Sequence, residues 1–328
     1  DLSGEDISNI EPLESLINLE FLNLNDNKIS DIGPISELTN LEKIGLSGND
    51  IKNYDPLLNH KNLKWLELKK NEISGLSFLQ NASKLVTLDL KGSKIKKIDF
   101  ITKIDKLKKI RLSNKYIEDL TPLGELKNLE TLFIEHINKK DLKVISDITS
   151  LEVLYINNKN ENEINSLNNL GKDLTNLKEL YIENSGITKI DILANYQDLK
   201  YLNLRNNNIK EISVFKNVTG LKRINLSKNE IDDISPLKEL NEPEQINLSD
   251  NKISDISPLL EIDKKKGFRR IEYLNINNNL IKEEEIPEGL DVRVLIIDEE
   301  SDDWSRVPYI LPGWSHLDRY YFKILLTF

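Results

Sequence analysis

The chain has 328 residues, a formal net charge of −10, and neither cysteine nor methionine. The absence of cysteine excludes a disulfide scaffold, a cysteine-ligated zinc site and a thiol nucleophile. No apolar run approaches the roughly 20 residues that cross a bilayer, so we expect no membrane span. The acidic composition argues against nucleic acid as a partner.

An apolar pair separated by one residue recurs through the sequence, mostly every 22 residues. The pairs are Leu22/Leu24, Ile44/Leu46, Leu66/Leu68, Leu88/Leu90, Ile110/Leu112, Leu132/Ile134, Leu154/Ile156, Leu180/Ile182, Leu202/Leu204, Ile224/Leu226, Ile246/Leu248, Leu274/Ile276 and Leu295/Ile297. Because alternate side chains of a strand share one face, each pair predicts a short strand with two inward residues. One such unit cannot bury its own apolar edge, so the units must stack on one another.

The residues after each pair also repeat. An asparagine stands three residues beyond many pairs, namely Asn27, Asn49, Asn71, Asn207, Asn229, Asn251 and Asn279. We expect it to be buried and to bond the backbone of a tight turn. Apolar residues such as Ile29 and Ile32 follow, and then Pro34 predicts a short 3₁₀ segment. The expected fold is an α/β solenoid, a right-handed horseshoe with a parallel sheet on the concave face and 3₁₀ or short helices on the convex face.

This pattern resembles leucine-rich repeats, and its 22-residue form is similar to that of bacterial internalins. Two stretches carry the resemblance best, NLEFLNLNDNKISDIGPI from Asn18 and LKRINLSKNEIDDISPL from Leu221. The resemblance covers nearly the whole chain. It implies a secreted or cell-surface bacterial protein that binds a protein partner without catalysis.

We divide the chain into a leucine-rich repeat domain of about 13 repeats at residues 1–297 and a C-terminal capping segment at 298–328. The stretch from Val307 to Asp318 resembles the ending of many cytosolic leucine-rich repeat proteins, including the leucine-rich regulatory subunit of a Ser/Thr phosphatase. A simpler interpretation is that Leu311, Trp314 and Leu317 cover the open edge of the last repeat.

The middle of the chain departs from the pattern. The asparagine position holds Ser93, Lys115, Ile137 and Lys159 in four successive units. Either the turn differs there or the asparagine series is interrupted. The stretch DLKVISDIT, which begins at Asp141, predicts a short amphipathic helix in place of the proline turn.

Positive charge is concentrated in residues 84–115, which contain eleven Lys or Arg and three Asp. Lys91, Lys94, Lys109 and Arg111 belong to this stretch, which we call the basic belt. One interpretation is solvated surface, and the other is an electrostatic docking patch for an acidic partner. No set of aromatic residues for base stacking accompanies the belt, which disfavours single-stranded nucleic acid.

The concave face is the expected binding surface. The residue between the two inward positions is aromatic on three successive strands, at Phe133, Tyr155 and Tyr181, and Tyr201 lies diagonally beside them. Trp65 and Arg205 flank this row. We expect these side chains to point outward into the horseshoe, and exposed aromatic side chains in a row are typical anchors of interfaces. The alternative is that the rings stack on one another and stabilise the sheet.

The sequence offers no catalytic or metal-binding set. Its three histidines, His60, His136 and His316, are far apart along a fold in which distance along the chain becomes distance in space. No glycine-rich phosphate loop joins a strand to a helix. We therefore expect no enzyme activity, no cofactor and no metal.

Three functional hypotheses follow. The first is a monomeric, non-enzymatic protein-interaction module, internalin-like and secreted or at the cell surface of a bacterium. The second is a cytoplasmic scaffold or phosphatase regulatory subunit, which the Val307–Asp318 ending suggests. The third is a structural element of a larger protein.

Overall fold

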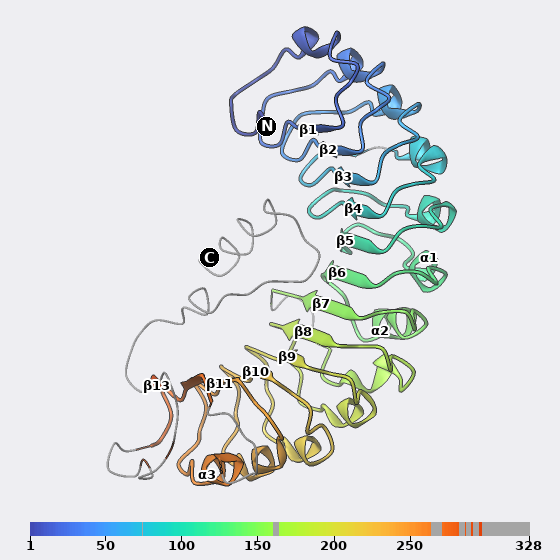
Figure 1. Cartoon of the computed structure of the whole chain (residues 1–328). Coiled ribbons are helices and arrows are strands. Elements are labelled where there is room, and N and C mark those ends of the chain that lie inside the picture. The colour runs from blue at the N-terminus through green and yellow to red at the C-terminus, as the bar shows by residue number, and fades with distance from the viewer. Residues whose placement is uncertain are drawn as a thin grey trace.

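A computed structural model shows the chain as an open curved stack of coils, with strands along the inner side and helices along the outer side (Figure 1). The structure describes residues 1–73, 75–159, 164–263, 271–281, 286, 290 and 295–296. The expected capping segment at 298–328 therefore lies outside the described residues. The α/β solenoid with a parallel concave sheet is confirmed.

The described residues form thirteen strands in a single sheet, arranged in the order of the sequence. The strands are β1 (Phe21–Asn23), β2 (Lys43–Gly45), β3 (Trp65–Glu67), β4 (Thr87–Asp89), β5 (Lys109–Ser113), β6 (Thr131–Glu135), β7 (Val153–Asn157), β8 (Glu179–Glu183), β9 (Tyr201–Asn203), β10 (Arg223–Asn225), β11 (Gln245–Asn247), β12 (Tyr273–Asn275) and β13 (Leu295–Ile296). We number each coil by its strand. Parallel pairing keeps equivalent residues of neighbouring coils opposite each other, for example Leu22 and Ile44.

Short helices connect the strands on the convex side. The 3₁₀ helices are η1 (Glu11–Leu13), η2 (Gly33–Ile35), η3 (Asp55–Leu57), η4 (Ser77–Asn81), η5 (Asp99–Lys103), η6 (Leu167–Leu170), η7 (Asp191–Asn195), η8 (Ser213–Lys216) and η9 (Ser235–Glu239). The α-helices are α1 (Thr121–Gly124), α2 (Asp141–Ile145) and α3 (Pro258–Asp263). Proline stands in the first turn of η1, η2, η3, α1 and η9, where its missing N–H costs little. Helix α2 confirms the prediction made from DLKVISDIT.

One hydrophobic core runs continuously through the stack. In coil 1 the core contains Leu22 of β1 and Leu24 directly after it, and the returning segment contributes Ile29, Ile32 and Ile35 from the opposite side. All five are buried. Since each coil repeats this arrangement, every internal coil is covered on both sides by its neighbours.

The repeated asparagines form a ladder between coils. Asn49 Nδ2 donates to the carbonyl oxygen of Leu24 in the preceding coil (2.9 Å) and to that of Leu46 in its own coil (3.2 Å). Its Oδ1 accepts from the backbone N–H of Ile29 (2.9 Å). The same pattern is found at Asn207, Asn229 and Asn251. Each buried amide therefore ties two coils together, as the sequence predicts.

The ladder is interrupted in coils 4–8. Ser93 only donates to the carbonyl of Leu90 within its own coil (2.6 Å). In coil 7 the neighbouring Asn158 takes over part of the role, because it accepts from the N–H of Ile137 and donates to its carbonyl, both at 2.9 Å. Strands β5 to β8 have five residues each, whereas the other strands have at most three. Coils 5–8 thus gain strand pairing where they lose asparagine bonds.

Candidate functional site

A continuous row of side chains crosses the concave face on β4 to β8. The sheet register places Asp89, Arg111, Phe133, Tyr155 and Tyr181 directly opposite one another. Arg111 Nη1 lies 3.3 Å from Asp89 Oδ2, and the guanidinium carbon lies 4.7 Å from the centre of the Phe133 ring. The ring centres are 5.3 Å apart for Phe133 and Tyr155, and 5.9 Å for Tyr155 and Tyr181. We call these five residues the spine.

Burial within the spine corrects one expectation. Phe133 is only 8% exposed and Tyr181 only 3%, so the prediction that both rings are exposed is wrong. The reason is that each ring packs against its neighbours in the same row, and Tyr181 also donates its hydroxyl to Glu179 Oε2 (2.8 Å). Tyr155 is half-buried. The anchoring role of Phe133, Tyr155 and Tyr181 stays a prediction.

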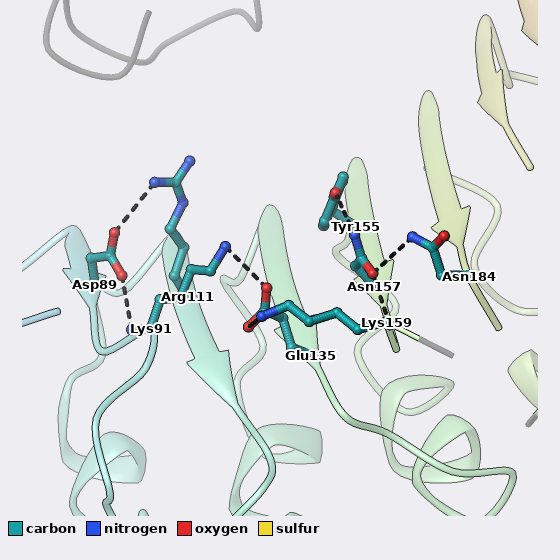
Figure 2. A network of polar contacts seen from close by, with 8 residues as sticks. All are labelled: Asp89, Lys91, Arg111, Glu135, Tyr155, Asn157, Lys159 and Asn184. Atoms are coloured by element: carbon teal, nitrogen blue, oxygen red, sulfur yellow. Dashed lines mark hydrogen bonds and ion pairs between the residues drawn. The ribbon is translucent and has the colours of Figure 1, made fainter. Parts of the chain in front are cut away.

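A polar network lies beside the spine at the carboxyl ends of the strands (Figure 2). Glu135 follows Phe133 by two residues and is 5% exposed. Its carboxylate pairs with Lys91 of coil 4 (3.0 Å) and with Lys159 of coil 7 (3.6 Å). One buried carboxylate therefore bridges cations from both directions along the stack.

Asn157 connects this network to the aromatic residues (Figure 2). Its Nδ2 donates to the hydroxyl oxygen of Tyr155 (3.3 Å). Its Oδ1 accepts from the backbone N–H of Lys159 and from Asn184 Nδ2, both at 3.0 Å. The orientation of the Tyr155 ring is consequently fixed by a polar contact as well as by stacking.

Part of the basic belt is paired with carboxylates of neighbouring coils. Lys94 is exposed and pairs with Glu72 (2.9 Å), 22 residues earlier. Lys108 pairs with Glu130, 22 residues later. Because equivalent positions of adjacent coils are neighbours, a run of lysines in one coil meets carboxylates of the next. Docking of an acidic partner by Lys91, Lys94, Lys109 and Arg111 stays a prediction.

The residues predicted to flank the spine are half-buried. Trp65 Nε1 donates to Glu67 Oε1 (2.8 Å), and Lys43 Nζ lies 6.0 Å from the Trp65 ring centre. Arg205 Nη1 donates to Ser227 Oγ (3.1 Å). The guanidinium of Arg223 lies 5.2 Å from the ring centre of Tyr201.

Several carboxyl groups on the concave face have altered acidity. Burial raises the pKa of Glu179. Burial also raises the pKa of Glu183, although Arg205, Asn203 and Tyr155 act in the opposite direction. These carboxylates lie where water is partly excluded, and there a nearby charge acts more strongly than it does in bulk water.

A cationic cluster on coils 9 and 10 was not singled out in the sequence. It consists of Lys200, Arg205, Lys222, Arg223 and Lys228, all half-buried on or beside β9 and β10. The signal was available, since segments 200–206 and 222–228 contain these cations and no acidic residue. These cations are divided between two coils, so they do not form one continuous run along the chain as those of the basic belt do.

A polar hollow of about 460 Å³ lies between coils 5 and 6 at the carboxyl ends of β5 and β6. Its polar lining comes from Asn114, Lys115, Glu118, His136, Asn138 and Asp141. Asn114 Nδ2 donates to Asp141 Oδ2 (3.1 Å), and burial raises the pKa of Asp141. The hollow lies where Lys115 and Ile137 replace ladder asparagines.

The described residues contain no group of three His, Cys, Asp or Glu that could hold a metal ion. His60 is 2% exposed and follows η3 on the convex side, whereas His136 follows β6. His316 lies outside the described residues. Nor does the described part of the chain contain a helix long and apolar enough to cross a membrane.

Comparison with known proteins agrees with this geometry. The family described as "Leucine Rich repeats (2 copies)" matches residues 17–59 and 197–239. An internalin of Listeria monocytogenes, InlF, is 28% identical, with a TM-score of 0.69 over 88% of this chain and 84% of that one. A leucine-rich repeat protein of Leptospira interrogans shares the fold at 21% identity, with a TM-score of 0.54 over 87% of this chain and 91% of that one.

No curated protein matches the sequence at a significant level. The repeat matches and the similarity to InlF nevertheless support an internalin-like leucine-rich repeat protein. This class of fold is a scaffold for protein interaction.

Proposed function

We propose that the protein is a non-enzymatic binding module that holds a protein partner on its concave face. The observation that carries the proposal is the arrangement of half-exposed Trp65, Tyr155, Tyr201 and Arg205 on or beside one continuous sheet. Aromatic and arginine side chains supply much of the binding energy at interfaces, commonly about 2 kcal/mol or more for a true anchor.

The buried spine residues have a supporting role in this proposal. Phe133 and Tyr181 pack on either side of Tyr155 and hold its ring in place. A side chain that is fixed before binding loses less conformational entropy on association than a mobile one does. The aromatic row can therefore both stabilise the sheet by stacking and anchor a partner. Stacking holds the Tyr155 ring in the orientation in which it would contact the partner.

We further propose that the protein acts as a monomer at the surface of a bacterium or after secretion. The similarity to InlF, which is an internalin, supports this location. The cytoplasmic alternative rests on the ending between Val307 and Asp318, which lies outside the described residues. We therefore favour the extracellular function.

The natural absence of cysteine allows a clean test by site-directed cross-linking. A single cysteine is introduced at Lys43 in β2 or Val153 in β7 on the concave side, or at Lys103 in η5 or Asn195 in η7 on the convex side. Each variant is labelled with a benzophenone maleimide, incubated with culture supernatants and cell extracts, and irradiated.

We expect one protein to be cross-linked by both concave variants and by neither convex variant. Substitution of Tyr155 or Tyr201 by Ala should then abolish the adduct from both concave positions. Equal cross-linking from the two faces, or adducts that persist in the tyrosine variants, would contradict the proposal.

A further inference from the structure

We propose that the polar hollow between coils 5 and 6 is a subsite that receives a basic side chain, lysine or arginine, of the protein partner. The inference rests on the proposed concave-face function and adds a contact at the edge of that face. It arises from two features of the hollow, a hydrogen-bond acceptor without a donor and carboxylates without a cation.

The hollow coincides with a change in the repeat pattern. In coils 1–3 and 9–11 the turn asparagine is buried, whereas Lys115 takes that position in coil 5 and is exposed. The space beside it, about 460 Å³, falls within the usual range of ligand pockets, about 300–1,000 Å³. The hollow is therefore large enough to take a long side chain.

The side chain of Asn114 holds the acceptor that lacks a donor. Its Nδ2 donates to Asp141 Oδ2 (3.1 Å) and to the carbonyl oxygen of His136 (3.4 Å), and these contacts fix the orientation of the amide. The Oδ1 atom is buried and accepts no hydrogen bond from any residue that the structure describes. A buried acceptor without a donor is unfavourable, and an N–H group of a ligand would satisfy it.

Two carboxylates of the hollow have no cation beside them. Asp141 is half-buried and accepts through Oδ2 from the backbone N–H of Asn138 (2.7 Å) and from Asn114, and Glu118 is exposed. No described lysine or arginine lies within ion-pair distance of either carboxylate. Burial raises the pKa of Asp141, because it disfavours the charged form. A cation bound in the hollow would stabilise that charge.

The neighbouring carboxylate of Glu135 differs in this respect. It pairs with Lys91 (3.0 Å) and Lys159 (3.6 Å), so its charge is already offset within the chain (Figure 2). The N–H of Asn114 donates to the carbonyl oxygen of Glu135 (2.9 Å). The hollow consequently lies directly beside the polar network at the edge of the concave face, where a partner held on that face can reach it.

A basic side chain fits these groups better than an anion or an apolar group does. The oxygens of Asn114, Glu118 and Asp141 match the N–H donors of an ammonium or guanidinium group, which form charge-assisted hydrogen bonds with carboxylates. An apolar group would leave the same oxygens unsatisfied. Lys115 also lines the hollow and opposes a cation, but its side chain is exposed and can keep its ammonium group in water.

The test uses the tripeptides acetyl-Ser-Lys-Ser-amide and acetyl-Ser-Arg-Ser-amide, with acetyl-Ser-Gln-Ser-amide as the uncharged match. Binding to the full chain is followed by NMR through the side-chain amide signals of Asn114 and Asn138, which both line the hollow. The variant E118Q/D141N removes the two negative charges. The control D105N/E125Q removes the same charge from two exposed carboxylates that follow η5 and α1 on the convex side.

We expect both basic tripeptides to shift the Asn114 signals of the unmodified chain and the Gln tripeptide to leave them unchanged. E118Q/D141N should bind the basic tripeptides at least fivefold more weakly, and D105N/E125Q within twofold of the unmodified chain. K115Q should bind them about twofold more tightly, because it removes a positive charge from the lining. A hollow with a purely structural role would not gain affinity in this variant.

Circular dichroism and urea midpoints show whether each variant is folded. Asp141 accepts its two hydrogen bonds through Oδ2, and the oxygen of an asparagine can keep both. If E118Q/D141N nevertheless does not fold, E118Q alone changes an exposed position and should still weaken binding at least twofold.

Four results would overturn the inference. They are unchanged binding by E118Q/D141N, an equal loss in D105N/E125Q, equal shifts with the Gln tripeptide, and tighter binding of calcium chloride or spermidine than of the basic tripeptides at the same signals. The last result would assign the hollow to a metal ion or to a free polyamine.

Failure of the subsite remains separate from failure of the proposed function. If the concave cysteine variants still cross-link a partner while neither basic tripeptide binds, only the subsite is rejected. If cross-links arise equally from the convex face, the proposed function itself is rejected.

Discussion

The outer coils and the central coils of this solenoid are joined by different interactions. Coils 1–3 and 9–12 carry the buried asparagine at the turn, so a polar ladder connects them at one edge of the sheet. Coils 4–8 lack this asparagine and are joined instead across the concave face by the spine, from Asp89 to Tyr181. The five coils without the ladder residue are the same five that contribute a spine residue.

The replacement of the ladder by the spine shows how a repeat protein can change the side chains of its concave face while its coils remain stacked. The ladder satisfies backbone groups in the turn and leaves the concave side chains free to vary. The spine stabilises the stack through the concave side chains themselves, so the surface proposed to meet the partner is also structural in the centre. We therefore expect substitutions in the two regions to have different effects.

The largest effect is expected from Asn229→Ala in the ladder. The substitution leaves the N–H of Ile209 and the carbonyls of Leu204 and Leu226 without the bonds that Asn229 provides. Buried groups left unsatisfied cost about 1–3 kcal/mol each, so we expect a loss of about 3–5 kcal/mol in the free energy of unfolding. Urea denaturation followed by circular dichroism measures it.

Ser93→Ala is the matched control for Asn229→Ala, since Ser93 occupies the same repeat position in coil 4. It removes a single bond to the carbonyl of Leu90, and we expect a loss of about 1 kcal/mol. Equal losses for the two variants would show that the ladder and non-ladder coils do not differ in the way described.

Phe133→Ala is expected to have the next largest effect, about 3 kcal/mol, because it removes a buried ring from the middle of the spine. The loss includes the contact with Arg111 and that with Tyr155. Asn225→Ala changes the same column in coil 10, where the side chain mainly accepts from Ser227, and should cost about 1 kcal/mol. Urea denaturation of the two variants measures these losses in the free energy of unfolding. A smaller loss for Phe133→Ala than for Asn225→Ala would contradict the structural role of the spine.

A smaller and pH-dependent effect is expected at His60, which is buried next to the ladder coils 2 and 3. Burial lowers the pKa of the His60 imidazole. The unfolded chain therefore binds a proton near pH 6.5 that the folded chain does not bind, and stability falls as the pH drops below about 6.5. Hydrogen exchange at pH 7 and pH 5 should show weakened protection in coils 2 and 3.

His60→Leu serves as the control for this pH effect. It removes the titrating group, so the loss of protection in coils 2 and 3 between pH 7 and pH 5 should disappear. The same loss in the variant would assign the effect to other groups.

The smallest effect is expected from Lys94→Gln. Lys94 and Glu72 are both well exposed, and exposed ion pairs contribute little to stability. We expect no measurable shift of the urea midpoint at physiological salt. A clear destabilisation would mean that ion pairs between coils contribute to the stack on the outer surface as well.

Much of the fold was predictable because each coil repeats the same arrangement of buried apolar residues and turn residues. The spacing of the apolar pairs located the strands, and the recurrent asparagine predicted the ladder. The register of Phe133, Tyr155 and Tyr181 also followed from the spacing. Their burial did not, because it depends on how long side chains from adjacent coils pack over each ring.

The charge distribution shows what a linear analysis of the sequence leaves out. Lys94 and Glu72 are 22 residues apart, and so are Lys108 and Glu130, so their pairing could have been found by comparing neighbouring coils. Asn158 is a different case, because a shift of one residue in the turn brings it into the ladder in place of Lys159. Such a shift is decided by local backbone geometry and is not visible in the repeat pattern.

The most direct test of the account compares hydrogen exchange of the chain alone and of the chain saturated with the partner that concave-face cross-linking captures. We predict increased protection in peptides covering β3 to β10 and unchanged exchange in the convex helices η5 and η7. Protection confined to the convex helices, with unchanged exchange on the strands, would contradict the claim that the inner surface of the solenoid binds the partner.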